Sequence, residues 1–318
     1  MKKLILILPY FGNFPNYFAL WLKSASYNKN IDYLLVTDND KLDSYENIMW
    51  EKMSFSEMKD LVRSKFDFNI KLNRPYKLCD FKPAYGYIFS EYIKEYKYWG
   101  HCDPDIIWGN LDYFINDPIN KNKDRIYQHG HLCIYKNNKE NNMLFIKKSS
   151  KHGITYKDVF NMNYSAHFDE GPIINELFKD KNNYNKVDFA DIVYQQFHFK
   201  LAQDTENNDC KQVYQWNNGR LFGYFFKDGE IMQKEFAYIH LQKRKMEIDV
   251  ENVNRTNCFN IIPNRFIWNK EIDIDFIINN SKDSKKYSYM QKKLRISEII
   301  NNIASGALKY RIIDKIRK

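Results

Sequence analysis

Two aspartates one residue apart are the residues of this sequence best suited to chemistry. Asp103 and Asp105 flank Pro104 within the segment 98–111, YWGHCDPDIIWGNL. The apolar and aromatic residues before them predict a short buried strand, and the proline predicts that this strand stops there. Two carboxylates at the mouth of a strand need a compensating charge, which a hard divalent cation with oxygen ligands supplies. The alternative is an ordinary turn with a capping aspartate.

A lysine and aspartate cluster lies upstream of this pair. Lys77, Asp80 and Lys82 belong to the segment 75–86, PYKLCDFKPAYG, which leads into an amphipathic helix predicted over residues 87–96. One interpretation is that they contact a base, a ribose or a phosphate beside the metal. The other is that they are solvated charges at the start of a helix, and the spacing leaves both open.

A histidine pair interrupts a strand predicted over residues 125–136. His129 and His131 are separated only by a glycine, and two histidines on one strand face can bind a metal. The pair lacks the additional ligands of a zinc site. We therefore expect hydrogen bonding to a substrate or within the protein.

An acidic pair precedes a helix predicted over residues 173–178. Asp169 and Glu170 lie where the positive end of the helix dipole favours carboxylates. Either they cap the helix, or one of them acts as a general base that faces an acceptor hydroxyl.

A histidine and three cations follow a strand predicted over residues 236–241. His240 would supply a metal ligand, and the cations would neutralise the oxygens of a metal-bound diphosphate. The alternative is a basic loop on a soluble surface. The three cations are Lys243, Arg244 and Lys245.

The elements that must position these residues alternate along the first part of the chain. Strands are predicted over residues 3–9, 32–37 and 48–53, with helices over 16–26 and from Ser54 or Ser56 to 65. This order predicts an α/β sheet whose strand ends carry a ligand site. Further on, a hairpin is predicted from strands 211–216 and 221–226 around the turn 217–219.

The composition is that of a globular protein in a reducing compartment. Of the 318 residues 44% are apolar and 17% are aromatic, which excludes a disordered chain. The first apolar run is too short for a signal peptide, and no run reaches the roughly 18 residues of a membrane span. Five scattered cysteines without a C-x-x-C pair predict neither disulfides nor a structural zinc site. They are Cys79, Cys102, Cys133, Cys210 and Cys258.

The net charge of +9 is concentrated at the carboxyl terminus. Residues 281–318 hold 11 Lys and Arg against 3 Asp and Glu, so of the totals of 49 and 40 the remainder keeps 38 and 37. A nearly neutral body argues against a nucleic-acid binder. We expect a catalytic domain at 1–280 and a basic amphipathic helical tail at 281–318. The apolar face of the tail suits an anionic membrane surface or the protein core. That face comprises Ile296, Ile299, Ile300, Ile303 and Ala307.

Combined in this order, the sequence blocks resemble the bacterial GT-A glycosyltransferases. More closely, they are similar to a family of glycosyltransferases of capsule and polysaccharide clusters. The blocks are PYFG-x-FP, CDFKPAYG, D-x-D-x-x-WG, DEG and H-x-QKRK. The resemblance covers about residues 4–266.

The resemblance implies a GT-A-like, Rossmann-type mixed sheet flanked by helices, in a metal-dependent hexosyltransferase. The donor would be a nucleotide sugar, UDP-linked, and the acceptor a polysaccharide or a lipid-linked glycan at the inner face of the cell membrane. Asp103, Asp105 and His240 match the ligands of Mn²⁺ or Mg²⁺, and Asp103 also matches a donor contact.

The resemblance, together with the residue types themselves, gives roles to the remaining positions. Asp169 and Glu170 lie where inverting enzymes place the catalytic base, and a retaining enzyme of the same fold is the alternative. His129 and His131 are the candidates for contact with acceptor or substrate. The donor-side positions are Lys77, Asp80, Lys82, Lys243, Arg244 and Lys245.

One further class remains open. A metal-dependent phosphoesterase or nuclease also needs clustered aspartates and basic residues. Such sites draw several Asp and His ligands from different strands, whereas only one tight pair stands out in this sequence.

Overall fold

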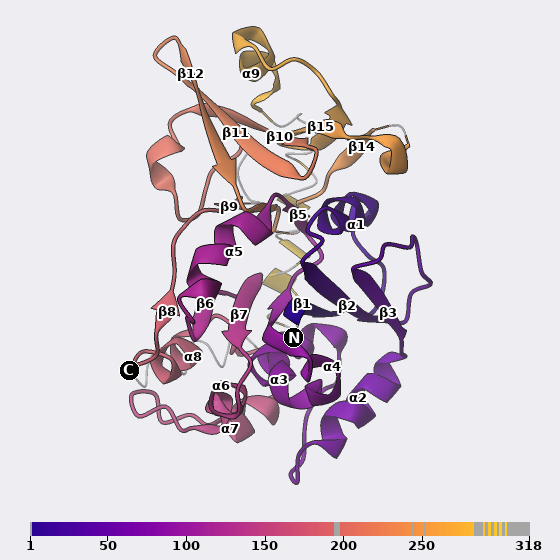
Figure 1. Cartoon of the computed structure of the whole chain (residues 1–318), viewed down its shortest axis with the longest axis vertical. Coiled ribbons are helices and arrows are strands. Elements are labelled where there is room, and N and C mark those ends of the chain that lie inside the picture. The colour runs from indigo at the N-terminus through magenta and orange to yellow at the C-terminus, as the bar shows by residue number, and fades with distance from the viewer. Residues whose placement is uncertain are drawn as a thin grey trace.

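A large central sheet with helices on both faces, and a second sheet at one end, make up the molecule (Figure 1). This computed structural model describes residues 2–193, 198–242, 244–250 and 252–282, with eight further positions. Those positions are Tyr289, Lys292, Lys293, Ile296, Ser297, Ile299, Ile300 and Ile303.

The central sheet is mixed and has seven strands in the order β3-β2-β1-β4-β7-β6-β8. Strands β1 to β4 are parallel, whereas β7 is antiparallel to both of its neighbours. The strand order reverses between β1 and β4, and ligands of α/β sheets bind outside the carboxyl ends of the strands at such a switch point. The strands are β1 (Lys2–Pro9), β2 (Ile31–Thr37), β3 (Ile48–Lys52), β4 (Tyr96–Cys102), β6 (Arg125–His129), β7 (Leu132–Lys136) and β8 (Asn183–Tyr184).

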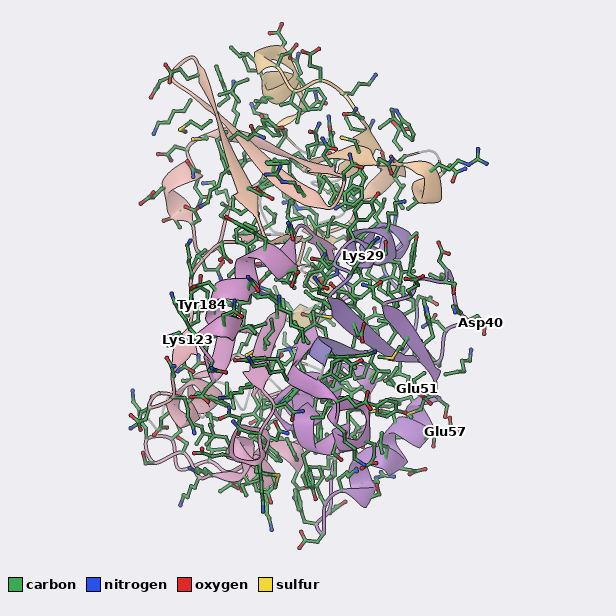
Figure 2. The ribbon with its side chains drawn as sticks, in the orientation of Figure 1. Lys29, Asp40, Glu51, Glu57, Lys123 and Tyr184 are labelled. Atoms are coloured by element: carbon green, nitrogen blue, oxygen red, sulfur yellow. The ribbon has the colours of Figure 1, made fainter. Side chains whose placement is uncertain are left out.

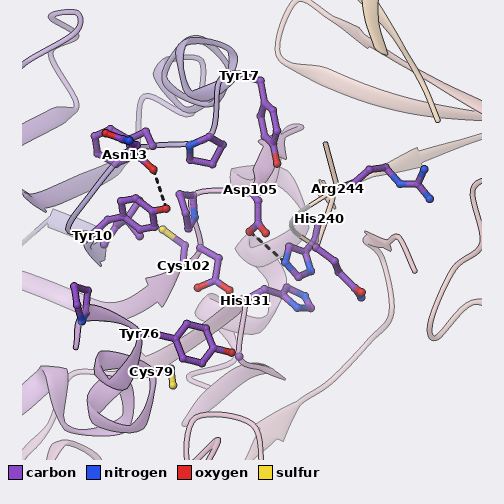
Figure 3. A pocket seen from close by; sticks show the side chains of 18 of the residues that line it. Tyr10, Asn13, Tyr17, Tyr76, Cys79, Cys102, Asp105, His131, His240 and Arg244 are labelled. Atoms are coloured by element: carbon purple, nitrogen blue, oxygen red, sulfur yellow. Dashed lines mark hydrogen bonds and ion pairs between the residues drawn. The ribbon is translucent and has the colours of Figure 1, made fainter. Parts of the chain in front are cut away.

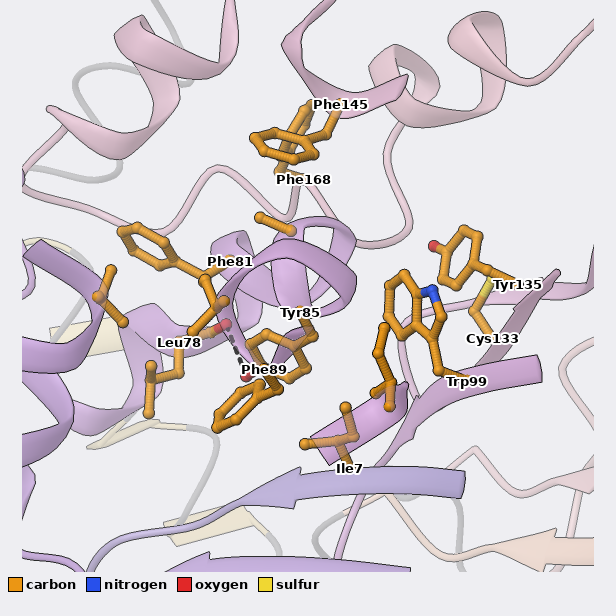
Figure 4. Packing of buried hydrophobic residues seen from close by; sticks show 14 of the residues in the cluster. Ile7, Leu78, Phe81, Tyr85, Phe89, Trp99, Cys133, Tyr135, Phe145 and Phe168 are labelled. Carbon is orange, nitrogen blue, oxygen red and sulfur yellow. Dashed lines mark hydrogen bonds between the residues drawn. The ribbon is translucent and has the colours of Figure 1, made fainter. Parts of the chain in front are cut away.

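Both faces of this sheet are buried, which explains the continuous apolar run in β1. Ile5 and Ile7 pack on one face with α2, η1, α3, α4, α7 and α8, in the cluster of Figure 4. Leu4 and Leu6 pack on the other face with α1 and α5. Successive side chains of a strand point to opposite faces, so a doubly covered strand needs apolar residues throughout. The helices are α1 (Phe18–Ser26), α2 (Phe55–Ser64), η1 (Pro75–Ala84), α3 (Tyr85–Ile88), α4 (Ser90–Ile93), α5 (Leu111–Asn120), α6 (Lys139–Asn142), η2 (Leu144–Ile146), α7 (Tyr156–Phe160) and α8 (Pro172–Leu177).

Two smaller sheets follow. A three-stranded sheet in the order β5-β13-β9 joins the central sheet to a six-stranded sheet in the order β12-β11-β10-β15-β16-β14. The core between them includes Trp216 and Phe259 together with Leu20 of α1. Their elements are β5 (Ile106–Trp108), β9 (Ala190–Asp191), η3 (Thr205–Asn207), β10 (Lys211–Asn217), β11 (Arg220–Lys227), β12 (Glu230–Phe236), β13 (Tyr238–His240), β14 (Glu247–Asp249), η4 (Val253–Arg255), β15 (Cys258–Ile262), β16 (Arg265–Trp268) and α9 (Ile274–Asn280).

The mixed α/β architecture with flanking helices is confirmed, and so are most local expectations. The strands predicted near the amino terminus match β1, β2 and β3. Ser54 caps α2 in a reciprocal capping box with Glu57, which Figure 2 labels at the surface. The predicted hairpin corresponds to β10 and β11.

Two local predictions are wrong in whole or in part. Residues 125–136 form the antiparallel hairpin of β6 and β7, not one interrupted strand, because the chain turns at Gly130. The helix predicted over 87–96 is present only in part, because it is broken at Phe89 into two single turns, α3 and α4, and ends at Ile93. It stops early because Tyr96 already pairs with Lys2 of β1 at the start of β4.

The basic tail is described at only a few positions. Each described position from 289 to 303 is helical and exposed, and Ile296, Ile299, Ile300 and Ile303 are 48% to 58% exposed. Ala307 lies outside the described residues. Across the part of the chain that the structure describes, no helix is both long enough and apolar enough to cross a membrane.

Replacing Gly100 in the middle of β4 by alanine should destabilise the fold. A Cβ at this position would lie 2.5 Å from the backbone oxygen of Cys133 and 2.8 Å from Leu6. Overpacking of this kind costs about 1–3 kcal/mol, so Gly100→Ala should lower the urea midpoint of unfolding. Lys97→Ala, at a partly exposed position on the same strand, is the control. An unchanged midpoint in Gly100→Ala would contradict the packing described for β4.

Candidate active site

A cavity of about 1610 Å³ opens at the carboxyl ends of β1 and β4, at the switch point of the central sheet (Figure 3). One wall is the turn that follows β1, which contributes Tyr10, Asn13 and Tyr17. The opposite wall is the segment after β13. The site residues predicted from the sequence did not include this turn, although a turn directly after the first parallel strand is where such sheets bind ligands.

The Asp103–Pro104–Asp105 segment is fixed through its backbone. The Asp103 amide donates to the carbonyl of His131 at 3.0 Å, and the Leu241 amide donates to the carbonyl of Asp105 at 2.9 Å. The indole of Trp21 donates to the Asp103 carbonyl at 3.1 Å. As predicted, β4 ends at Cys102 and both carboxylates line the cavity.

Asp103, Asp105 and His240 converge from two separate parts of the chain. Each offers one ligand atom, and these atoms lie within 4.8 Å of one another. The convergence follows from pairing, because β13 aligns His240 with Ile106 of β5, the strand directly after the aspartates. Two carboxylates and one imidazole are a donor set that suits Mn²⁺ or Mg²⁺. These residues therefore fit the divalent ion that the sequence predicts.

His240 compensates buried negative charge. Its Nε2 lies 3.3 Å from Oδ1 of Asp105, and its Nδ1 lies 2.8 Å from Oδ1 of Asp191. Burial lowers the pKa of His240, but the two carboxylates outweigh burial and raise that pKa to about 10. The imidazolium is therefore a counter-charge that a metal ion would replace.

Asp191 is a residue of this site that the sequence analysis missed. Strand β9 aligns it with His240 in parallel register. Gln242 and Gln203 also donate to its carboxylate, at 2.7 Å and 3.2 Å. In the sequence Asp191 is one aspartate among many, without a neighbouring motif, so only the pairing of β9 with β13 identifies it.

Lys82 connects the D-x-D segment to the acidic pair. Its Nζ donates to Oδ1 of Asp103 at 2.7 Å and to the carbonyl of Gly130 at 2.6 Å, and it lies 3.1 Å from Oδ2 of Asp169. Burial lowers the pKa of Lys82, but the two carboxylates reverse this effect and hold that pKa well above its usual range. Lys82 lines the cavity and is a fixed cation within it.

Asp169 and Glu170 also line the cavity. As predicted, they precede a helix, α8, whose N-cap is Gly171. Burial raises the pKa of Asp169 to about 6, although Lys82 acts in the opposite direction. The hydrogen bond with His167 lowers the pKa of Glu170. A Cβ on Gly130 would lie 2.8 Å from Glu170 and 2.9 Å from Asp169. The acidic pair can therefore approach this turn only because residue 130 is glycine.

Lys77 and Asp80 do not reach the cavity. They pair with each other at 2.5 Å, and they are 2% and 0% exposed. Asp80 accepts from the amides of Ala166 and Phe168, and Lys77 donates to the carbonyls of Val159 and Tyr164. This geometry is that of a clamp on the segment before Asp169, rather than of the donor contact that the resemblance implies.

The cations after His240 separate in the structure. Arg244 lines the cavity but is 1% exposed, and its guanidinium donates to the carbonyls of Pro263 and Val193. Figure 3 shows it extending away from Asp105. Lys245 is exposed and lines the cavity. Lys243 lies outside the described residues.

The two histidines of the β6–β7 turn differ in position. His131 lines the cavity, is 5% exposed and is hydrogen-bonded through Nε2 to the hydroxyl of Tyr238 at 3.0 Å. Its ring stacks on that of His240 at 4.2 Å. His129 stacks behind it at 5.1 Å and does not line the cavity.

Three solved structures show a distant likeness to this chain. The galactosyltransferase LgtC, in a complex with donor and acceptor sugar analogues, is 12% identical with a TM-score of 0.36, covering 59% of this chain and 75% of its own. An active-site mutant of LgtC is 12% identical with a TM-score of 0.39, covering 76% of this chain and 88% of its own. The glycosyltransferase GlyE of Streptococcus pneumoniae TIGR4 is 13% identical with a TM-score of 0.33, covering 59% of this chain and 46% of its own. Likeness at this level assigns no function.

Sequence comparison gives a family but no activity. No curated protein matches the chain at a significant level. The profile described as "Family of unknown function (DUF6625)" matches residues 6–270, which is most of the chain. The protein therefore belongs to the DUF6625 family.

Proposed function

We propose that this protein is a metal-dependent glycosyltransferase that moves a sugar from a nucleotide-sugar donor to a glycan or lipid-linked glycan acceptor. The observation that carries the proposal is the convergence of Asp103, Asp105 and His240 in a large cavity at the switch point of a Rossmann-type sheet. The sequence blocks that resemble GT-A enzymes support it independently.

The residues of the cavity suit the charges of such a reaction. Transfer breaks the bond between the anomeric carbon and a phosphate oxygen, and negative charge develops on the departing nucleoside diphosphate. A divalent ion held by the D-x-D pair and His240 would supply Lewis-acid stabilisation of that leaving group. Lys82 and Lys245 line the same cavity and add positive charge to it.

Asp169 is the better candidate for the base. An acceptor hydroxyl needs a group that takes its proton during attack, and a base works best when its pKa lies near the working pH. Asp169 has a pKa of about 6 and a position inside the cavity. Glu170 has a lowered pKa and is half exposed. We therefore assign an inverting reaction with Asp169 as the base, and a retaining reaction is the alternative.

One observation favours a second candidate, a metal-dependent phosphoesterase. The structure brings five ligand-type side chains from separate segments to one wall, as two-metal hydrolases require. The two activities differ in product, since a transferase joins the sugar to the acceptor and an esterase cleaves a phosphodiester without one. Cleavage of bis(4-nitrophenyl) phosphate in the absence of any acceptor would favour the esterase. The five residues are Asp103, Asp105, His131, Asp191 and His240.

Asp105→Asn should weaken Mn²⁺-dependent binding of a nucleoside diphosphate by at least about tenfold, because it removes one anionic ligand. The ligand is first chosen by a thermal-shift screen of nucleoside diphosphates and nucleotide sugars with Mn²⁺. Calorimetry with and without Mn²⁺ then measures the affinity. Asp40→Asn is the matched control, because that side chain is 97% exposed and lies at the periphery of Figure 2. Equal affinity in both variants would remove Asp105 from the metal site.

Asp169→Asn should lower turnover by about 10²–10⁴-fold and leave donor affinity unchanged, because a general base acts in the transition state. In the wild type the carboxylate form predominates above pH 6. Turnover should therefore fall as the pH drops below about 6, and this limb should be absent in the variant. Glu170→Gln, the neighbouring control, should keep the limb. Near-normal turnover in Asp169→Asn would favour the retaining alternative.

The tail supports a proposal of peripheral contact with an anionic membrane. Four described isoleucines are exposed beside a surplus of basic residues, and each basic residue near such a surface adds about 1 kcal/mol. The full chain should co-sediment with anionic vesicles at low salt. Deletion of residues 285–318 should abolish this and preserve donor binding. Equal co-sedimentation of both proteins, or unfolding of the shortened one, would show that the tail has another role.

A further inference from the structure

His131, Asp191 and His240 form a second group of side chains able to hold a metal ion. Each offers one ligand atom within 4.8 Å of the other two, and all three line the cavity. Their exposed fractions are 5%, 5% and 8%. We propose that this group is a second metal site, selective for nitrogen-preferring ions such as Zn²⁺ and Co²⁺. Because it shares His240 with the D-x-D site, we infer that occupation of one site excludes occupation of the other.

The donor sets of the two sites differ in kind. The D-x-D site offers two carboxylates and one imidazole, whereas the second site offers two imidazoles and one carboxylate. Oxygen-rich sets suit Mg²⁺ and Mn²⁺, and imidazole-rich sets suit Zn²⁺, Co²⁺ and their neighbours. The same cavity wall therefore presents alternative sites to ions of different preference.

Exclusion follows from the chemistry of the shared imidazole. A neutral imidazole has one nitrogen with a lone pair and one that carries a proton. The Nε2 atom of His240 faces Asp105 and the Nδ1 atom faces Asp191. Binding through Nε2 leaves an Nδ1–H that donates to Asp191. Binding on the side of Asp191 requires the other tautomer and removes His240 from the D-x-D site.

The second site is already organised. Tyr238, two residues before His240 on β13, holds the ring of His131 through its hydroxyl, and Phe189 packs against both rings. Asp191 is held by Gln203 and Gln242.

This inference rests on the proposed function in one respect, the Mn²⁺ site that shares His240. Its consequence is that Zn²⁺ acts as an inhibitor that displaces the catalytic ion, rather than as a substitute for it.

The test uses the full-length, metal-free protein and two metals. Electron paramagnetic resonance measures bound Mn²⁺, and the visible absorption of Co²⁺ together with calorimetry of Zn²⁺ reports the second site. In the wild type, saturating Zn²⁺ should release the bound Mn²⁺. Retention of Mn²⁺ beside bound Zn²⁺ would overturn the exclusion and favour a two-metal centre.

Two variants separate the sites. His131→Gln should weaken Zn²⁺ and Co²⁺ binding by about tenfold or more and change Mn²⁺ affinity by less than about twofold. Asp103→Asn should do the reverse. If Zn²⁺ affinity is unchanged in His131→Gln and is lost in Asp103→Asn, both ions use the D-x-D site and the second site does not exist.

Two further outcomes of the experiment can also be interpreted. Should His131→Gln fail to fold by circular dichroism, Asp191→Asn replaces it, with the same loss of Zn²⁺ affinity expected and a smaller effect on Mn²⁺. Unchanged Zn²⁺ affinity there would overturn the site. A wild type that binds no Mn²⁺ would count against the proposed function, whereas the Zn²⁺ measurements on the variants would still decide the second site.

Discussion

Two carboxylates one residue apart, Asp105 buried and Asp103 partly buried, impose the main constraint on this structure. Asp103 and Asp105 stand at the end of a central strand, where an uncompensated charge would be costly. The fold supplies a separate cation for each, Lys82 for the first and His240 for the second. These cations come from elements far apart in the chain. Their pairing holds η1, the β6–β7 turn and β13 around one cavity.

Lys82 connects three parts of the cavity wall through close contacts of its ammonium group. The ammonium lies between Asp103, Asp169 and the carbonyl of Gly130. The buried Lys77–Asp80 pair holds the backbone that leads to Asp169 from behind. A buried pair of this kind is a poor source of net stability, but breaking it leaves a costly unpaired charge. Its effect here is to fix where the acidic pair stands relative to the metal ligands.

The three-stranded sheet gives His240 its place. Strand β13 pairs with β5 on one side and with β9 on the other, so one histidine lies between Asp105 and Asp191. The same pairing brings the six-stranded sheet against α1 and closes the far wall of the cavity. Metal chemistry and the attachment of the second sheet therefore depend on one short strand.

The sequence alone determined the features set by neighbouring residues. Apolar runs gave β1, β2 and β3, the capping box at Ser54 gave α2, and the Asn-Asn-Gly turn gave the β10–β11 hairpin. The end of β4 at Cys102, just before Asp103, followed from Pro104. These patterns act over a few residues, so the chain carries them whatever it packs against.

Only the tertiary structure decided which of the marked residues meet. Pairing between distant strands selected Asp191 and placed His131 beside His240, and no local pattern encodes such pairing. Lys77 and Asp80 are buried and pair with each other, and the guanidinium of Arg244 donates to backbone carbonyls. From the sequence, their charges had indicated contact with a phosphate group. The extent of the helix predicted after Gly86 was likewise set by the pairing of β4 with β1. Charge and spacing in a sequence identify residues able to do chemistry. Their partners are decided by long-range packing, because packing determines which polar groups are buried away from water.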